Sequence, residues 1–267
     1  MTEKAILYDA SKCTACRGCQ VACKQWNDLL AEVTTNRGAY ENPPDLSFNT
    51  WLKMRFTEVG DGPEDLRWIF TRRACMHCTD AACVEVCPTK ALYHHELGFV
   101  AYNRELCTGC GYCVEACPFD VPRTGGGAAG TIHGVRTMNK CIFCEDRVTN
   151  GEIPACVKTC PTGALTYGDR SDMVEEGKAR VTALKATYPN ATLYGENELG
   201  GLHVLYVLDD MPEAYGLPVN PKMPVAATAW QDVLQPIGWG VAGLAVVGLG
   251  LNYIIARRKA KVASEEK

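Results

Sequence analysis

The chain has 267 residues, a formal net charge of −4 and 47% hydrophobic residues. This length fits one or two domains with enough apolar side chains to build a core. The slightly acidic balance provides no basic surface for nucleic acid, so we expect no nucleic-acid partner. The first ten residues contain neither an apolar signal core nor a twin arginine. We therefore expect that any export of this chain would depend on a partner.

The first elements in chain order are a strand and a hairpin. An apolar strand is expected at Ala5–Tyr8, and a cysteine-free insert occupies residues 24–74. Within the insert, residues 51–59 and 66–72 alternate between apolar and polar around Gly60-Asp61-Gly62, which predicts a β-hairpin.

The later elements are a loop, a helix and two strands. The glycine-rich run 125–130 predicts a flexible loop and lacks the Gly-Lys-Ser/Thr end of a phosphate-binding loop. A helix is expected over Asp172–Thr187, and residues 193–194 and 202–208 predict strands. A loop is expected at 212–224. The predicted apolar face of the helix consists of Val174, Val181, Leu184 and Tyr188.

All 16 cysteines fall into four groups of four with short, regular spacings. This spacing resembles the ligand runs of bacterial ferredoxins, in which four thiolates bind each [4Fe–4S] cluster. Sixteen thiolates predict four clusters, with iron as the only metal and electron transfer as the function. The groups are Cys13, Cys16, Cys19 and Cys23; Cys75, Cys78, Cys83 and Cys87; Cys107, Cys110, Cys113 and Cys117; and Cys141, Cys144, Cys156 and Cys160.

The ferredoxin analogy also predicts an exchange of ligands, because the fourth cysteine of a run binds the cluster of its partner run. The second and third groups follow each other directly, so we pair them, and the first group is left to pair with the fourth. The expected ligand sets are Cys13, Cys16, Cys19 and Cys160; Cys23, Cys141, Cys144 and Cys156; Cys75, Cys78, Cys83 and Cys117; and Cys87, Cys107, Cys110 and Cys113.

Other uses of the cysteines fit less well. Disulfide frameworks are typical of small secreted chains, and structural zinc uses pairs of cysteines without a third thiolate two residues on. Radical chemistry at a cluster usually uses a Cys-x3-Cys-x2-Cys run, and none occurs here. We therefore expect no catalytic residue in this chain.

The C-terminal region predicts a membrane span. Ile237–Ala256 is uncharged over twenty residues, about 30 Å as a helix, which matches a hydrocarbon core. Trp239 and Tyr253 lie near its ends, and a basic run starts at Arg257. The positive-inside rule predicts a cytoplasmic C-terminus and a cluster domain on the opposite, periplasmic side of the inner membrane. A buried core helix is the alternative.

Several segments between the cysteines carry a family resemblance. The chain is similar to the iron–sulfur (beta) subunits of membrane-bound formate dehydrogenases, within the four-cluster subunits of molybdopterin oxidoreductase complexes. The resemblance covers nearly the whole chain, although the stretch before the first cysteine is shorter than in some relatives. It is carried by residues 23–28, 42–47, 51–56, 75–78, 109–113, 146–148, 154–164 and 200–204 and by the single C-terminal helix.

The resemblance implies partners that the spacing does not show. A catalytic alpha subunit with a molybdenum or tungsten bis-pterin would oxidise formate, and a membrane gamma subunit with haem b would pass the electrons to quinone. The alpha subunit would carry the twin-arginine export signal. Alternatives are the equivalent subunit of a polysulfide, nitrate or dimethyl sulfoxide reductase or of a membrane hydrogenase, a soluble ferredoxin, and a zinc-binding module.

The expected fold is α+β, with two pseudo-symmetric ferredoxin-like units. Residues 1–30 with 136–224 form an outer unit, 73–135 an inner unit, 31–72 the hairpin insert, and 225–267 the transmembrane helix with its basic tail. His77 and His203 are expected to be packing residues, although His77 could also tune or relay. Lys140, Arg147 and Lys158 are expected either to raise cluster potentials or to pair with a neighbouring subunit.

Overall fold

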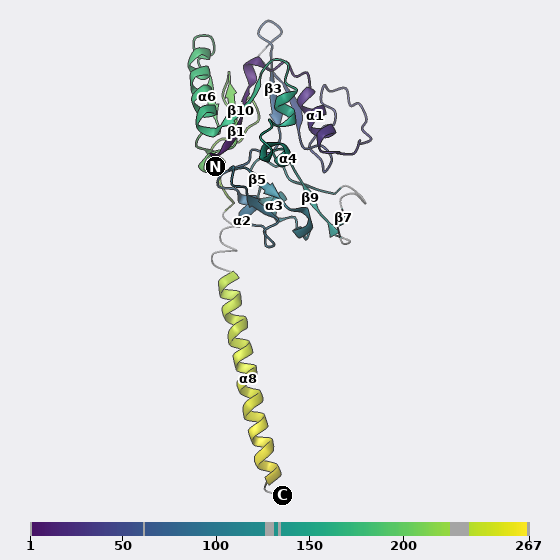
Figure 1. The fold of residues 1–267 in the computed structure, drawn as a ribbon, viewed down its shortest axis with the longest axis vertical. Helices are drawn as coiled ribbons and strands as arrows, with labels where there is room; N and C mark the ends of the chain where they lie inside the picture. Colours follow the sequence, from purple (N-terminus) through teal and green to yellow (C-terminus); the bar gives the residue numbers. More distant parts are fainter. Residues whose placement is uncertain (1, 61, 126–130, 133–134, 225–234, 266–267) are drawn as a thin grey trace. The chain divides into compact units, whose positions relative to one another are not determined.

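The structure is a computed structural model that describes residues 2–60, 62–125, 131–132, 135–224 and 235–265. The chain divides into two compact units, Met1–Met223 and Pro224–Lys267. The first unit combines short strands and helices with long loops, whereas the second contains one long helix, α8 (Figure 1). The chain is therefore of mixed helix and strand type.

A four-stranded sheet joins the two ends of the first unit. Its order is β10-β1-β12-β11, in which β1 (Lys4–Asp9) lies antiparallel to β10 (Leu165–Asp169) and parallel to β12 (Val204–Leu208). β11 (Thr192–Tyr194) pairs with β12 at the edge. Segments almost 200 residues apart are thus held side by side.

The alternation along β1 sorts its side chains between two cores. Ala5 and Leu7 pack against α6 (Arg170–Leu184), which covers one face of the sheet (Figure 1). Ile6 and Tyr8 point to the other face and join the largest core of the molecule, which also contains buried cysteines. The sheet therefore separates an ordinary helix–sheet core from the core around the cysteines.

The predicted hairpin is confirmed as β2 (Lys53–Val59) and β3 (Arg67–Arg73), which pair over their whole length. Leu52, Met54 and Ile69 are almost fully buried in the largest core. The insert therefore forms one side of the cysteine-containing core.

A smaller core surrounds the second and third cysteine groups. It packs Leu92, Val100 and Met138 against several of these cysteines. The short hairpin of β4 (Leu92–His94) and β5 (Val100–Tyr102) forms its centre. The remaining elements of the unit are η1 (Ala10–Lys12), α1 (Gly18–Trp26), α2 (Ala82–Glu85), η2 (Arg104–Leu106), α3 (Tyr112–Ala116), β6 (Arg123–Thr124), β7 (Thr131–Ile132), β8 (Val135–Arg136), β9 (Met138–Asn139), α4 (Glu145–Thr149), α5 (Ala155–Lys158) and η4 (Glu198–Gly200).

The other expected elements of the first unit are present with small shifts. The expected strand at Ala5–Tyr8 is extended by one residue at each end, and the expected helix at 172–187 is α6, which begins and ends earlier. Val181 and Leu184 are buried as predicted, whereas Tyr188 lies beyond the helix and packs there only in part. The region 212–224 contains no helix or strand, and most of the glycine-rich run lies outside the described residues.

The second unit contains α8 (Gln235–Glu265). Its segment Pro236–Arg257 has 22 residues and contains an 18-residue window with a mean hydropathy of 1.7 and no buried residue. A buried core helix would show the opposite, so this segment fits a single-pass membrane anchor. The expected span Ile237–Ala256 lies entirely within it.

Candidate metal centres

The first cysteine loop is held by a capped turn at the end of β1. The Asp9 carboxylate accepts a hydrogen bond from the Ser11 amide at 3.0 Å, and the Cys13 amide donates to the Ala10 carbonyl at 3.2 Å. Ala15 and Arg17 adopt left-handed backbone conformations, which turn the chain tightly between the cysteines. One cavity is lined by four cysteines: Cys13, Cys16, Cys19 and Cys160.

A second cavity is lined by cysteines from opposite ends of the first unit. They are Cys23 from α1, Cys141 and Cys144 from the loop before α4, and Cys156 from α5. Cys144 has a φ of +51°, so the backbone reverses directly at this side chain. All four cysteines are buried. The fold therefore brings together the two sets that ligand exchange predicts for the first and fourth groups.

The second and third groups are also mixed. The Cys78 thiol interacts electrostatically with the thiols of Cys75, Cys83 and Cys117, and burial together with these neighbours raises its pKa. Burial likewise raises the pKa of Cys113 to about 12, with further increases from three thiols. Those three belong to Cys87, Cys107 and Cys110. All four expected sets are thus gathered in space.

The thiol environment fits a bound group larger than one ion. All 16 cysteines are free in the structure, and burial raises the pKa of Cys19 and Cys144 to about 12. Metal ions that bind thiolates must displace such protons. Within the described residues, no three His, Cys, Asp or Glu side chains converge as they would around one tetrahedral ion. Cysteine quartets around cavities suit a cubane better.

Arg72 supports the same conclusion, and the sequence analysis missed it. Its side chain is 1% exposed, its Nη2 lies 4.0 Å from Cys156 Sγ, and its Nε and Nη1 have no hydrogen-bond partner. A buried guanidinium needs a compensating anion. A cluster ligated by thiolates is such an anion. The signal in the sequence was a charged residue opposite Met54, on the apolar face of the predicted hairpin.

The two predicted histidines are packing residues. His77 is fully buried and meets the stacked rings of Phe99 and Phe143 edge-on, and its Nδ1 accepts from the Val100 amide at 3.2 Å. His203 is also buried, and its Nδ1 donates to the Lys4 carbonyl at 2.8 Å.

The three predicted cations differ from one another. Lys140 is buried and donates from Nζ to the carbonyls of Val100 and Cys141 at 2.8 and 3.0 Å. Arg147 pairs with Glu152 at 2.7 Å and stacks over the Trp26 ring, whereas Lys158 is exposed. Lys140 and Arg147 are therefore both buried, whereas Lys158 lies at the surface.

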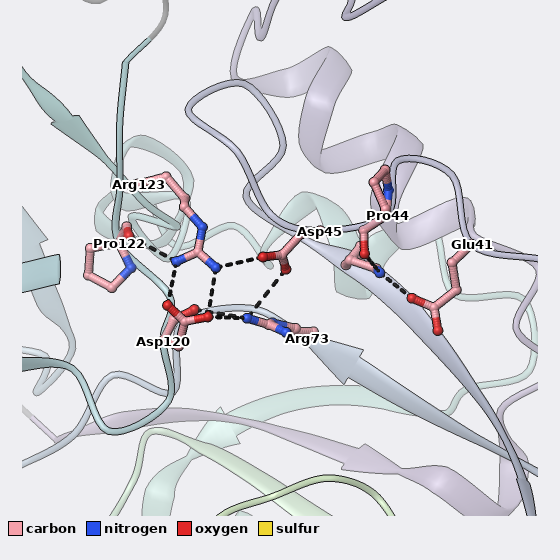
Figure 2. A network of polar contacts seen from close by, with 8 residues as sticks. Glu41, Pro44, Asp45, Arg73, Asp120, Pro122 and Arg123 are labelled. Carbon is pink, nitrogen blue, oxygen red and sulfur yellow. Dashed lines mark hydrogen bonds and ion pairs between the residues drawn. The ribbon is translucent and has the colours of Figure 1, made fainter. Parts of the chain in front are cut away.

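A polar network ties the insert to the inner cysteine loops (Figure 2). Arg123 contacts the carboxylates of Asp45 and Asp120 at 2.8 Å, and Arg73 contacts the same two carboxylates at 3.3 and 2.7 Å. Asp120 follows Cys117 by three residues. The network therefore links the insert, the end of β3 and a cysteine loop.

Comparison with known proteins gives consistent matches. Residues 66–170 match the family model of a 4Fe-4S dicluster domain. The chain is 41% identical over 257 residues to the nitrate-inducible formate dehydrogenase iron-sulfur subunit of Escherichia coli K12, which covers 94% of this chain and 85% of that protein. A formate dehydrogenase iron-sulfur subunit of Haemophilus influenzae is 42% identical over 255 residues, with 93% and 78% covered.

A further relative is the beta subunit of another formate dehydrogenase. Formate dehydrogenase 2 subunit beta (cytochrome c-553) of Nitratidesulfovibrio vulgaris is 36% identical over 220 residues, which cover 79% of this chain and 96% of that protein. These identities extend well beyond the cysteines and cover most of each related protein. The chain belongs to the family of formate dehydrogenase iron–sulfur subunits.

Proposed function

We propose that this chain carries electrons through four [4Fe–4S] clusters within a formate dehydrogenase complex. The observation that carries the proposal is the gathering of 16 cysteines into four quartets, each composed of three cysteines from one motif and one from another. Each cluster would accept and release one electron. The chain itself would hold the clusters and take no catalytic part in formate chemistry.

The proposed ligands are the four sets given by ligand exchange, and the neighbouring elements support them. In the outer part, β1 leads through η1 to Cys13 and pairs with β10, which follows the fourth motif. In the inner part, β5 leads through η2 to Cys107 and pairs with β4, which follows the second motif. We infer two ferredoxin-like units, 1–30 with 136–224 and 73–135, related by pseudo-symmetry.

The electrostatic neighbours of three thiols support a linear order, because the pKa of each is raised by burial and, in part, by a thiol of the adjacent set. The Cys19 thiol interacts with Cys156 of the next set, and Cys141 interacts with Cys75 of the one after. Cys83 interacts in turn with Cys113 of the last set. An electron would therefore pass through the sets of Cys13, Cys141, Cys75 and Cys107 in this order or in reverse.

The exposed cysteines support the same order. Among the 16, only Cys16 and Cys110 are exposed, and they belong to the two end sets. The ends of the row would thus face partners. These would be a catalytic subunit with molybdenum or tungsten bis-pterin and a membrane subunit with haem b that reduces quinone.

The membrane arrangement is part of the proposal. The apolar segment of α8 would span the inner membrane once, with its C-terminus in the cytoplasm because Arg257, Arg258 and Lys259 follow it. The cluster domain would lie on the periplasmic side. Its partners in the bilayer would be lipid and the haem-bearing subunit.

The proposal is tested by EPR spectroscopy of the detergent-purified complex. Formate alone should produce the signals of reduced clusters, and iron analysis should give four clusters for this chain. Signals that require dithionite would reject formate as the electron source, whereas fewer clusters would reject the count.

Substitution of single ligands tests their exchange between motifs. Cys160→Ser should alter the same cluster signal as Cys13→Ser, whereas Cys156→Ser should alter the same signal as Cys23→Ser. Equal effects of Cys160→Ser and Cys156→Ser on one signal would reject the exchange.

A further inference from the structure

Arg72 lies in the core between two of the cysteine sets. It lines the cavity of Cys23, Cys141, Cys144 and Cys156, and its charge also acts on Cys19 of the neighbouring set. The residue is the penultimate one of β3, opposite Met54 of β2, whose sulfur lies 3.8 Å from Cys19 Sγ. The hairpin insert therefore delivers this guanidinium to the contact between the two sets.

The charge of Arg72 is not neutralised by a carboxylate in the described part of the chain. None of the ion pairs formed there includes Arg72, and Nε and Nη1 remain without a partner. Its backbone carbonyl accepts from the Tyr206 hydroxyl, so the strand is fixed while the side-chain donors stay available. Burial of an unpaired charge is costly, and nearby anions must offset that cost.

Thiolate-ligated clusters are the anions that this position would serve. A [4Fe–4S] cluster with four thiolates is negatively charged when oxidised and more so when reduced. A fixed positive charge in a water-poor core therefore stabilises the reduced form more than the oxidised form. Hydrogen bonds to cluster sulfur act in the same direction.

We propose that the charge of Arg72 raises the reduction potential of the cluster held by Cys23, Cys141, Cys144 and Cys156. To a smaller extent it also raises that of the cluster held by Cys13, Cys16, Cys19 and Cys160. This inference rests on the proposed function, because it concerns clusters at these ligands. It assigns a role to the insert beyond closing the core, since the insert supplies the charge.

The test compares the unmodified, whole detergent-purified complex with four variants by EPR-monitored redox titration, with iron analysis of each. Arg72→Met removes the charge and all donors, Arg72→Gln removes the charge but keeps an amide donor, and Arg72→Lys retains the charge. Arg73→Met is the matched control, because Arg73 is the next residue of β3, has the same charge, and pairs with Asp45 and Asp120 instead.

We expect Arg72→Met and Arg72→Gln to lower the potential of one or two clusters by at least tenfold in the reduction equilibrium, which is 59 mV for one electron. Arg72→Lys should restore most of that shift, and Arg73→Met should leave all potentials unchanged. Unchanged potentials in Arg72→Met with full iron would overturn the proposal, as would an equal shift in Arg73→Met.

Loss of iron also decides the question. If both neutral variants lose a cluster and Arg72→Lys keeps it, the charge is required by the cluster, since a packing role would be lost with lysine as well. If all three variants lose it, the proposed electrostatic role is wrong. Failure of the proposed function would instead be seen in the unmodified complex, as missing clusters or a missing response to formate.

Discussion

Gly98 tests how closely the hairpin of β4 and β5 packs against His203, which directly precedes β12 of the four-stranded sheet. It lies between β4 and β5 with a φ of +91°, a conformation that L side chains rarely adopt. A Cβ at this position would lie within 2.8 Å of His203 Nε2 and 2.9 Å of Nδ1, and closer still to Cε1. His203 cannot retreat easily, because it is buried and its Nδ1 donates to the Lys4 carbonyl.

The magnitude of the Gly98→Ala effect follows from two terms. The left-handed conformation costs about 1–2 kcal/mol for a residue with Cβ. Overpacking of a filled site adds about 1–3 kcal/mol. Gly151→Ala is the matched control, because Gly151 has a φ of +76° and nothing within 4 Å of its Cβ position, so it carries only the first term.

The assay is the rate at which the purified complex loses its iron–sulfur absorbance in guanidinium with an iron chelator. If the contact with His203 opens before the iron leaves, the extra 1–3 kcal/mol makes Gly98→Ala about 5- to 150-fold faster than Gly151→Ala. Equal rates in the two variants would refute the argument that the hairpin is wedged against His203.

Three further predictions concern a titration, an ion-pair network and a cap. Burial lowers the pKa of His203, so below about pH 6.5 the unfolded chain binds a proton that the folded chain does not bind, and the free energy of unfolding falls toward lower pH. The rate of iron loss should therefore increase from pH 7 to 5.5, and should increase less in His203→Gln. Arg123→Gln should cost about 1 kcal/mol or less, because Asp45 is half-exposed and Asp120 is exposed. Limited proteolysis should then cut the insert faster, and a salt concentration of about 0.5 M, which screens such pairs, should reduce the difference. Asp9→Ala should cost about 1–2 kcal/mol, because it removes both the cap on the Ser11 amide and the 2.8 Å contact with Arg180. It should release iron faster than Asn103→Ala, which removes an exposed cap on the Glu105 amide. Equal rates of iron release in the two variants would contradict the argument that the buried cap stabilises the loop more than the exposed one.

The sequence predicted the features that depend on local pattern. The cysteine spacing, the hairpin of β2 and β3 and the apolar segment of α8 each repeat a regular motif over several residues, so neighbouring positions reinforce one another. All three are present, and the comparisons support the [4Fe–4S] chemistry that the spacing indicated.

The features that were missed depend on distant contacts. β4 and β5 have three residues each, too few for a periodicity to be visible, and β10 is defined by its pairing with β1. The parallel pairing of β1 with β12 joins segments that the chain separates by almost 200 residues. Arg72 was missed for a related reason: its place opposite Met54 on the apolar face of the hairpin was the one local signal, and its burial follows from contacts with distant segments.

Two buried cations lie beside the cysteine sets that stand in the middle of the proposed row. The end sets each include an exposed cysteine, so water reaches them and can stabilise a reduced cluster. The two middle sets contain no exposed cysteine, and a low-dielectric core opposes the extra negative charge of reduction. Each middle set has one buried cation nearby, Arg72 beside Cys156 and Lys140 acting on Cys83. In the proposed row these cations would keep the middle clusters reducible where water cannot, and without them an electron would meet an uphill step in the centre of the row.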